Sequence, residues 1–319
     1  MDQLRPLLIG QDPRASDRLW HLLYAAMRGA GHNAGFFVEA LSGIDIALWD
    51  IRGKVCGLPI YSLLGGPHRM SLPSYGASLI LSQEFDSLHA RLQTLMKTGH
   101  TIVKAKIGAN ALNPEAELDA LRRLAQEYEG RVRFVVDANG MYDFTMAVRV
   151  GRALEKLPVV WFEEPLAPDD RRHQAALAGA LEIPVAGGET EYTLAHFRDI
   201  LLAGAYDILQ PNVARAGGIS ECWKIAALAE AFQIPIAYQV GSSAGVCAAA
   251  TVHLAAATRN LLLYEHMGSG WSPEDPNPFR ADLVHGPVDV FDGSGICVPD
   301  GPGLGVELDE SVIERYRLA

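Results

Sequence analysis

The chain has 319 residues, of which 49% are hydrophobic and 20% are charged, and its formal net charge at pH 7 is −11. This length can bury a large core, either as one α/β domain or as a barrel with a smaller attachment. The acidic balance argues against nucleic acid and against an anionic membrane as partners, because both attract basic surfaces.

The spacing of the cysteines and the lengths of the apolar runs indicate the cellular compartment of the protein. The four cysteines are far apart in the chain: Cys56, Cys222, Cys247 and Cys297. Without paired spacing, they predict isolated buried thiols rather than a disulfide framework or a zinc site. The first residues lack the apolar core of a signal peptide, and no apolar run is long enough to span a membrane. We therefore expect a cytoplasmic protein.

Residues 14–65 carry two helical patterns of apolar residues with a glycine-rich break at 29–31. The first pattern includes Leu19, Leu23 and Met27, and the second includes Leu41 and Ile44. We interpret residues 1–70 as a partial, mainly helical capping domain that packs beside a larger unit.

From residue 74 onward, short β-like runs alternate with amphipathic stretches. The predicted strands are 74–79, 101–107, 133–138, 159–164, 183–188, 206–211, 234–239 and 260–265. The predicted helices between them are 84–98, 114–128, 143–156, 170–181, 191–203, 218–232 and 243–257. This alternation favours an α/β fold, a (β/α)8 TIM-type barrel over residues 71–270. The Gly- and Pro-rich residues 271–319 are predicted to return to the cap as an irregular segment.

Three acidic residues stand at the ends of apolar runs: Asp137, Glu163 and Glu189. Strand ends of a closed parallel barrel converge on one mouth, where three anions repel one another unless a cation neutralises them. Oxygen ligands without a nearby His or Cys cluster suit Mg²⁺, or Mn²⁺ in its place. We predict that these three residues bind the metal. Strand alternation assigns the adjacent Glu164 to the opposite face, as a rim partner.

Two lysines, Lys104 and Lys106, share one face of the strand 101–107 by the period-two rule. Charged side chains on a central barrel strand must point into the mouth, where two ammonium groups destabilise each other. At least one lysine is therefore expected to have a lowered pKa and to act as a general base. Asn139 lies on the same face as Asp137 and is a candidate donor to a substrate oxygen.

Several motifs resemble the enolase superfamily in its mandelate racemase-like branch. They are Lys104-x-Lys106, Asp137-Ala-Asn139, Glu163-Glu-Pro165, Gly188-Glu189, Gln210-Pro211, and the segments 40–50, 63–66 and 299–305. The resemblance covers about residues 7–310. Residues 9–14 and 277–280 are also similar to the galactarolactone cycloisomerase and acid-sugar dehydratase group of that family.

The resemblance implies Mg²⁺-assisted abstraction of the α-proton of a small carboxylate substrate through an enediolate. It implies dehydration of an acid sugar as the main reaction, with lactone isomerisation next. Lys106 would be the base, Lys104 would neutralise the substrate carboxylate, and Glu265 matches a position that hydrogen-bonds this carboxylate. His266 is expected to have a supporting role. The family also implies a homo-oligomer.

Two departures from the family pattern are visible. Many members carry an Asp–His dyad as a second base, whereas this chain has Asn212 and Gln239 at those positions, and amides do not shuttle protons near neutral pH. We expect Asn212 and Gln239 to bond each other and to shape the substrate pocket. A racemase or epimerase of a hydroxy acid, and a catalytically silent binder of metal and ligand, remain alternatives.

The second departure concerns the start of the chain. Family members open with a meander of strands that builds most of the cap, whereas here the sequence opens directly at residues 4–10 near the cap helices. Some ~50–80 residues of a family-sized cap on a barrel of this kind are expected to be missing.

Overall fold

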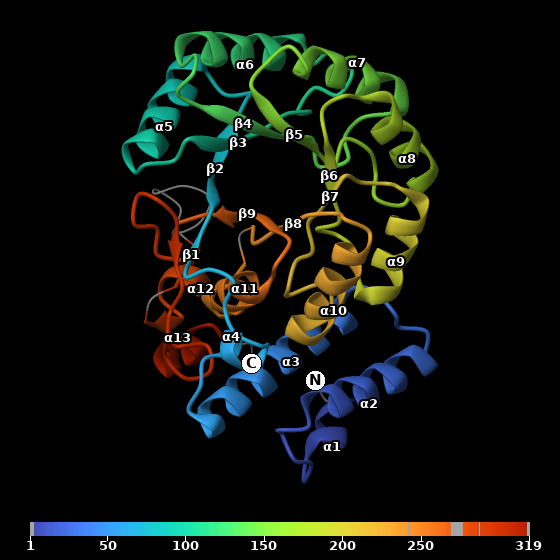
Figure 1. The fold of residues 1–319 in the computed structure, drawn as a ribbon, viewed down its shortest axis with the longest axis vertical. Coiled ribbons are helices and arrows are strands. Elements are labelled where there is room, and N and C mark those ends of the chain that lie inside the picture. Colours follow the sequence, from blue (N-terminus) through green and yellow to red (C-terminus); the bar gives the residue numbers. More distant parts are fainter. Residues whose placement is uncertain (1–2, 242, 269–276, 287, 318–319) are drawn as a thin grey trace.

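Eight parallel strands form the centre of the computed structural model, which describes residues 3–241, 243–268, 277–286 and 288–317. They close into a barrel in chain order, β2 to β9 (Figure 1). The strands are β2 (Ser74–Ile80), β3 (Ile102–Lys106), β4 (Arg133–Asp137), β5 (Val159–Glu163), β6 (Val185–Gly187), β7 (Ile208–Leu209), β8 (Ile236–Tyr238) and β9 (Leu261–His266). The predicted (β/α)8 barrel is confirmed. The observed strands are mostly shorter than predicted, because the residues at their ends leave the hydrogen-bonded ladder.

Seven helices connect these strands and surround the barrel (Figure 1). They are α5 (Phe85–Lys97), α6 (Glu115–Glu127), α7 (Phe144–Leu154), α8 (Arg171–Ala180), α9 (Thr193–Ala203), α10 (Gly218–Ala231) and α11 (Gly245–Ala257). Aspartates cap two of them: the side chains of Asp143 and Asp170 accept hydrogen bonds from N–H groups in the first turns of α7 and α8. All seven lie within the predicted ranges.

The barrel interior is filled by one side chain from each strand. This interior layer consists of Tyr75, Ile102, Val135, Trp161, Ala186, Ile208, Ala237 and Leu263. Because strand side chains alternate between the two faces, the residues two positions further along each strand also point inward, toward the carboxyl ends of the strands. The interior layer therefore sets which side chains reach the barrel mouth.

Four helices precede the barrel: α1 (Arg5–Leu8), α2 (Ser16–Gly29), α3 (Phe36–Cys56) and α4 (Ile60–Leu63). The two helices predicted for the cap are confirmed as α2 and α3, with the expected glycine-rich break between them. Helix α3 packs on α10, where Asp45 accepts hydrogen bonds from the backbone and hydroxyl of Ser220 at 2.9 and 2.6 Å. A Cβ on Gly218 would lie 2.4 Å from Asp45, so this approach requires glycine.

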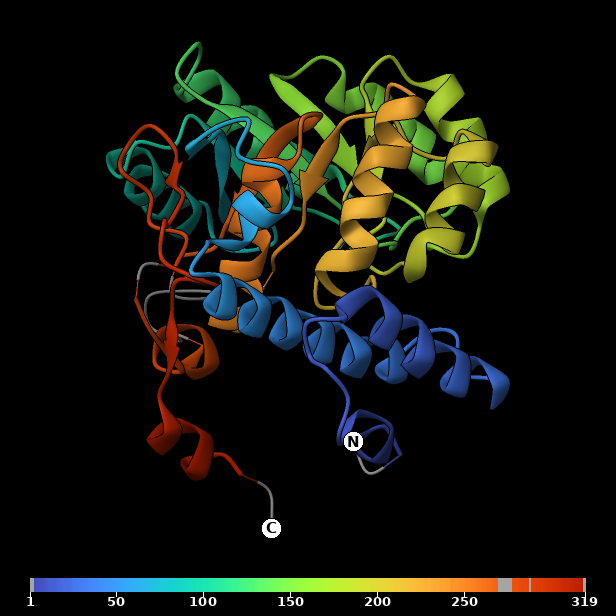
Figure 2. The same ribbon diagram turned by 60° about the horizontal axis from the view of Figure 1, so that its bottom comes forward.

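The C-terminal segment lies on the same side of the barrel as the cap helices (Figure 2). Its described elements are α12 (Pro278–Ala281), β10 (Val284–His285), β11 (Ile296–Cys297), β12 (Glu307–Leu308) and α13 (Glu310–Arg315). Strand β11 pairs with β1 (Ser71–Leu72), and β10 pairs with β12. The N–H of Leu304 donates to Asp50 of α3 at 2.8 Å, which joins this segment to the cap.

All four cysteines are unpaired, as predicted, but the predicted burial holds for Cys222 and Cys247 and is wrong for Cys56 and the partly exposed Cys297. Cys56 is exposed, because it lies at the last turn of α3, away from the barrel. Within the described residues, no helix combines the length and apolar character needed to cross a membrane.

A buried histidine at the junction of cap and barrel predicts acid sensitivity. His253 of α11 is fully buried and stacks on Tyr61 of α4 with ring centroids 5.6 Å apart. Burial lowers the pKa of His253 from 6.5 to about 4. As the pH falls, His253 is therefore protonated in the unfolded chain before it is protonated in the folded protein. The free energy of unfolding decreases by about 3 kcal/mol as the pH falls from 6.5 toward 4.

In urea unfolding, the His253→Phe variant should lose less stability between pH 7 and pH 4.5 than the wild type does. The matched control is His21→Phe, because the side chain of His21 is 60% exposed. An equal loss in wild type and His253→Phe would contradict this assignment.

Candidate active site

Charged side chains from neighbouring strands lie in register above the interior layer. In the strand register, Lys106 of β3 lies opposite Asp137 of β4, and Asp137 lies opposite Glu163 of β5. Lys104 lies two positions past an interior-layer residue, as do Asp137, Glu163 and Glu265 of β9. All four therefore point inward, and the barrel brings the predicted residues together at its mouth.

The ammonium of Lys104 lies at the centre of this cluster. Its Nζ lies 2.6 Å from Oε1 of Glu163, 2.6 Å from Oε1 of Glu265 and 3.5 Å from Oδ2 of Asp137. Lys104 is 1% exposed, and it lies over the ring of Tyr75 at 5.6 Å. A buried ammonium with close carboxylate partners on two sides is an ion pair of the kind that is costly to break.

We expected at least one of the two lysines to have a lowered pKa, and Lys104 is not that lysine. Burial alone would lower the pKa of Lys104, but the charges of Glu163 and Glu265 outweigh it and raise the pKa well above its usual value. The prediction considered the repulsion between the two lysines and not the carboxylates around them. Lys104 is therefore a fixed positive charge in this arrangement and not a base.

Glu265 is held as an anion. Burial opposes its ionisation, but the charge of Lys104 outweighs it and lowers the pKa of Glu265. Its Oε2 also accepts the backbone N–H groups of Val240 and Gly241 at 2.9 and 2.6 Å. With these partners, Glu265 is an acceptor that lacks a proton to give to a substrate carboxylate.

The remaining carboxylates of the mouth are hard to ionise together. Burial, with added repulsion from Asp137 and Glu189, outweighs the opposing charge of Lys104 and raises the pKa of Glu163 to about 8. Burial and the charge of Glu164 raise the pKa of Glu189 to about 8. Gly188, at φ +113°, turns the chain so that the side chain of Glu189 lines the mouth. Such a cluster is stabilised by added positive charge.

Glu164 belongs to the same cluster, in contrast to its predicted place on the opposite face. Strand β5 ends at Glu163, and Glu164 takes φ +35°, so the period-two alternation does not extend to it. It is 3% exposed, and burial together with the charges of Asp137 and Glu163 raises its pKa to about 7. Thr190 donates to its Oε1 at 3.4 Å.

Lys106 lies closer to solvent than Lys104, with 24% of its side chain exposed. Its Nζ donates to Oδ2 of Asp137 at 2.9 Å and to Oδ1 of Asn139 at 2.7 Å. Asn139 in turn is fixed by its own N–H, which donates to Oδ1 of Asp137 at 2.9 Å. The amine therefore stands at the edge of the mouth, where it can meet a bound molecule.

The predicted bond between Asn212 and Gln239 is confirmed. Nδ2 of Asn212 donates to Oε1 of Gln239 at 2.5 Å, across a bridge that joins the ends of β7 and β8. The N–H of Ala214 donates to Oδ1 of Asn212 at 2.8 Å, which fixes the orientation of that amide. At the positions of the family's Asp–His dyad, the mouth therefore carries two neutral amides.

A cavity of about 530 Å³, the mouth cavity, opens between these side chains. The predicted residues that line it are Lys104, Lys106, Asn139, Glu189, Asn212, Gln239 and Glu265. Two further charged lining residues were not predicted: Glu39 of the cap helix α3, and Arg215, whose Nε lies 3.6 Å from Oε1 of Glu39. No local sequence signal marks Glu39, because only the docking of the cap brings it to the barrel.

Gln210 is a further residue that was quoted only as part of a motif. It is fully buried, and within the described part of the chain neither its amide oxygen nor its amide nitrogen has a hydrogen-bond partner. Counting two positions from Ile208 of the interior layer places Gln210 inward, so strand alternation could have identified it. An unsatisfied buried amide is costly unless a bound group satisfies it.

The candidate ligand atoms at the mouth suit a hard divalent cation, because they are carboxylate oxygens that repel one another in a buried site. As the side chains stand, the described residues contain no group of three His, Cys, Asp or Glu in the arrangement of a metal site. The Lys104 ammonium instead lies between the acids. The assignment of Asp137, Glu163 and Glu189 as metal ligands therefore stays a prediction.

Comparison with known proteins agrees with this geometry. Residues 87–312 match the enolase C-terminal domain-like family, and residues 1–65 match the mandelate racemase / muconate lactonizing enzyme N-terminal domain. The chain is 34% identical to D-galactarolactone cycloisomerase of Agrobacterium fabrum, over 98% of this chain and 82% of that protein. It is 35% identical to arabinonate dehydratase of Saccharolobus solfataricus, over 98% of this chain and 81% of that protein.

Among solved structures, the 3,6-anhydro-D-galactonate cycloisomerase from Zobellia galactanivorans is similar, with a TM-score of 0.89 and 29% identity. The match covers 99% of this chain and 85% of that one. The barrel, the inward acids and lysines, and these matches over nearly the whole chain lead to one conclusion. The chain belongs to the enolase superfamily, in its mandelate racemase / muconate lactonizing enzyme branch.

Proposed function

We propose that this enzyme abstracts the α-proton of a carboxylate substrate with Lys106 as the base, and that the main reaction is dehydration of an acid sugar. Its relatives include dehydratases and cycloisomerases of acid sugars, so the chain is a lyase or an isomerase. The observation that carries the proposal is the position of Lys106, partly exposed at the edge of a cavity whose floor holds buried charges.

The two sides of the mouth cavity favour chemistry on one face of the substrate. Lys106 is the titratable group on its side, whereas the opposite side presents the bonded amides of Asn212 and Gln239. Racemisation needs a proton donor on the face opposite the base, and neutral amides do not serve in that role near pH 7. We therefore favour elimination over racemisation.

In this reaction the unprotonated Lys106 amine takes the α-proton, and the electron pair of the C–H bond moves into an enediolate. The β-hydroxyl then leaves with its bonding electrons, and the Lys106 ammonium returns the proton to it, so that water is released. The resulting enol becomes a 2-keto-3-deoxy acid. Lactone isomerisation would begin with the same proton transfer and is the second reaction of this site.

Charge on the floor of the cavity supports the enediolate. The fixed ammonium of Lys104 faces the cavity and would neutralise a substrate carboxylate. Asp137, Glu163 and Glu189 would hold Mg²⁺, or Mn²⁺ in its place, which would supply positive charge for the substrate oxygens. Asn139 lines the cavity and would bind an oxygen of the substrate. The homo-oligomer and the cytoplasmic location stay predictions from the sequence.

The proposal predicts turnover of acid sugars that depends on Lys106. We expect the wild type with Mg²⁺ to convert at least one member of a panel of aldonic and aldaric acids to a 2-keto acid. Substrate recovered from D₂O should carry deuterium at the α-carbon without inversion. The Lys106→Met variant should lose on the order of 10²–10⁴-fold in turnover.

The control for this variant is Lys97→Met, which removes an exposed lysine at the end of α5. Its turnover should equal that of the wild type. Exchange of the α-proton at the wild-type rate in Lys106→Met would overturn the choice of base, and an inverted product would favour the racemase.

The contacts of Lys104 predict competition between this side chain and a divalent cation. Replacing Lys104 by Met leaves Glu163 and Glu265 without their buried partner, which should lower the free energy of unfolding by about 3–5 kcal/mol without divalent ions. The same change removes a positive charge from the acids and should tighten Mg²⁺ binding. Unfolding midpoints with and without MgCl₂, together with calorimetric titration of Mg²⁺, measure both effects.

The comparison variant for Mg²⁺ binding is Lys106→Met. It removes an amine that is partly exposed in the wild type and leaves Lys104 in place. Mg²⁺ should stabilise Lys104→Met more than it stabilises either Lys106→Met or the wild type. Weaker Mg²⁺ binding by Lys104→Met than by the wild type would contradict the competition.

A further inference from the structure

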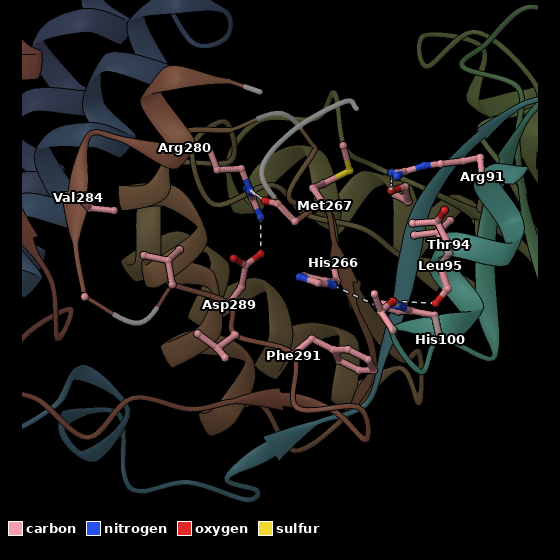
Figure 3. A pocket seen from close by; sticks show the side chains of 16 residues that line it. Arg91, Thr94, Leu95, His100, His266, Met267, Arg280, Val284, Asp289 and Phe291 are labelled. Atoms are coloured by element: carbon pink, nitrogen blue, oxygen red, sulfur yellow. Dashed lines mark hydrogen bonds and ion pairs between the residues drawn. The ribbon is translucent and has the colours of Figure 1, made fainter. Parts of the chain in front are cut away.

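A second cavity of about 530 Å³, the side cavity, lies beside the mouth cavity. It is bounded by α5, by the end of β9 and by the C-terminal segment (Figure 3). Ala77 and Met267 line both cavities, so they form the partition between them. The reaction proposed above uses no residue that lines the side cavity alone.

Two histidines in the side cavity form a chain of hydrogen bonds with a fixed direction. The hydroxyl of Thr98 donates its single proton to the carbonyl of Leu95 at 2.7 Å. We therefore assign Nδ1 of His100, which lies 2.9 Å away, as a donor to this hydroxyl oxygen. Nε2 of His100 lies 3.1 Å from Nδ1 of His266.

The direction of this chain determines which ring nitrogens carry protons. A neutral imidazole has one N–H, so His100 with its proton on Nδ1 accepts at Nε2, and Nδ1 of His266 donates to it. The remaining nitrogen of His266, Nε2, is then a bare acceptor. Burial keeps both rings neutral: it lowers the pKa of His266 to about 3 and also lowers that of His100.

This acceptor faces the side cavity. Figure 3 shows the ring of His266 with one nitrogen toward His100 and the other toward the Arg280–Asp289 pair. Among the residues that the structure describes, Nε2 of His266 has no hydrogen-bond partner. Phe291 stacks on both rings, with centroids 4.1 Å from His100 and 5.6 Å from His266, and holds them in place.

The buried charges of the side cavity are already paired. Arg280 forms an ion pair with Asp289, and both are almost fully buried. Arg280 also donates to the carbonyls of Gly268 and Ser243 at 2.7 and 3.2 Å. An ionised ligand would lose its hydration next to charges that neutralise each other, which is costly. Arg91 also lines the cavity, where its guanidinium donates to the carbonyl of Ala77 at 3.3 Å. Besides these paired groups, the cavity offers a neutral acceptor and the apolar surfaces of Phe291 and Met267.

We propose that the side cavity binds a small uncharged molecule with hydroxyl groups, one of which donates to Nε2 of His266 while its carbon chain packs on Phe291 and Met267. This site is separate from the reaction site and does not rest on the proposed function. Because Met267 and Ala77 border both cavities, its occupant lies directly beside the substrate.

Xylitol is a suitable probe, and xylonate is its charged counterpart. In wild-type protein labelled with ¹⁵N in histidine, Nε2 of His266 should resonate as an unprotonated nitrogen. Adding xylitol should shift this signal in a saturable way, and xylonate should shift it less. By direct titration, His266→Phe should bind xylitol about tenfold more weakly, the loss expected for one buried hydrogen bond.

The control is His89→Phe, which replaces a histidine of α5 that pairs with Glu127 at 2.8 Å, outside the side cavity. It should bind xylitol as the wild type does. A protonated Nε2 in the free protein, no shift with xylitol, or a larger shift with xylonate would each overturn the proposal. The wild-type signal alone decides these three points, even if His266→Phe does not fold.

Discussion

The ion pairs of Lys104 are the interaction on which the mouth of this barrel depends. One buried ammonium lies within 2.6 Å of two carboxylates that come from β5 and β9, on either side of the barrel. Without it, the acids of the mouth would be buried anions beside one another, a costly arrangement. Lys104 therefore makes the acidic site compatible with a folded barrel, and its charge would compete with that of a divalent cation bound by the same acids.

The positions of these groups follow from the regular geometry of the barrel. A single layer of apolar side chains fills its interior, one from each strand, and the charged residues stand two positions further along. The apolar layer excludes water below the cluster, so the charges interact strongly. The same alternation that builds a stable core thus concentrates the polar chemistry at one end.

The sequence predicted the strands, the helices and the convergence of Lys104, Asp137 and Glu163, because apolar runs that end in a charged residue mark strand ends facing a shared mouth. It also predicted the bond between Asn212 and Gln239. It did not predict the sign of the Lys104 pKa shift, since that sign depends on Glu265, which follows 161 residues later and is brought close only by barrel closure.

Two other features of the site depend on local or tertiary detail that periodicity does not contain. Glu164 joins the acids because its backbone leaves the extended conformation at φ +35°, where strand alternation no longer holds. Glu39 reaches the mouth cavity from the cap because α3 packs on α10 through Asp45 and Ser220. The side-cavity histidines, likewise, come from the loop before β3 and from the end of β9, and these two strands flank β2 only because the barrel closes.

We infer that the acids of the mouth bind a divalent cation within reach of Lys106. The most direct test is a crystal structure of the protein grown with Mn²⁺, located by its anomalous scattering. We expect one Mn²⁺ bound by Asp137, Glu163 and Glu189, with the Lys104 amine moved away from Glu163. Mn²⁺ at another place, or a mouth without Mn²⁺ in which Lys104 still contacts Glu163, would contradict it.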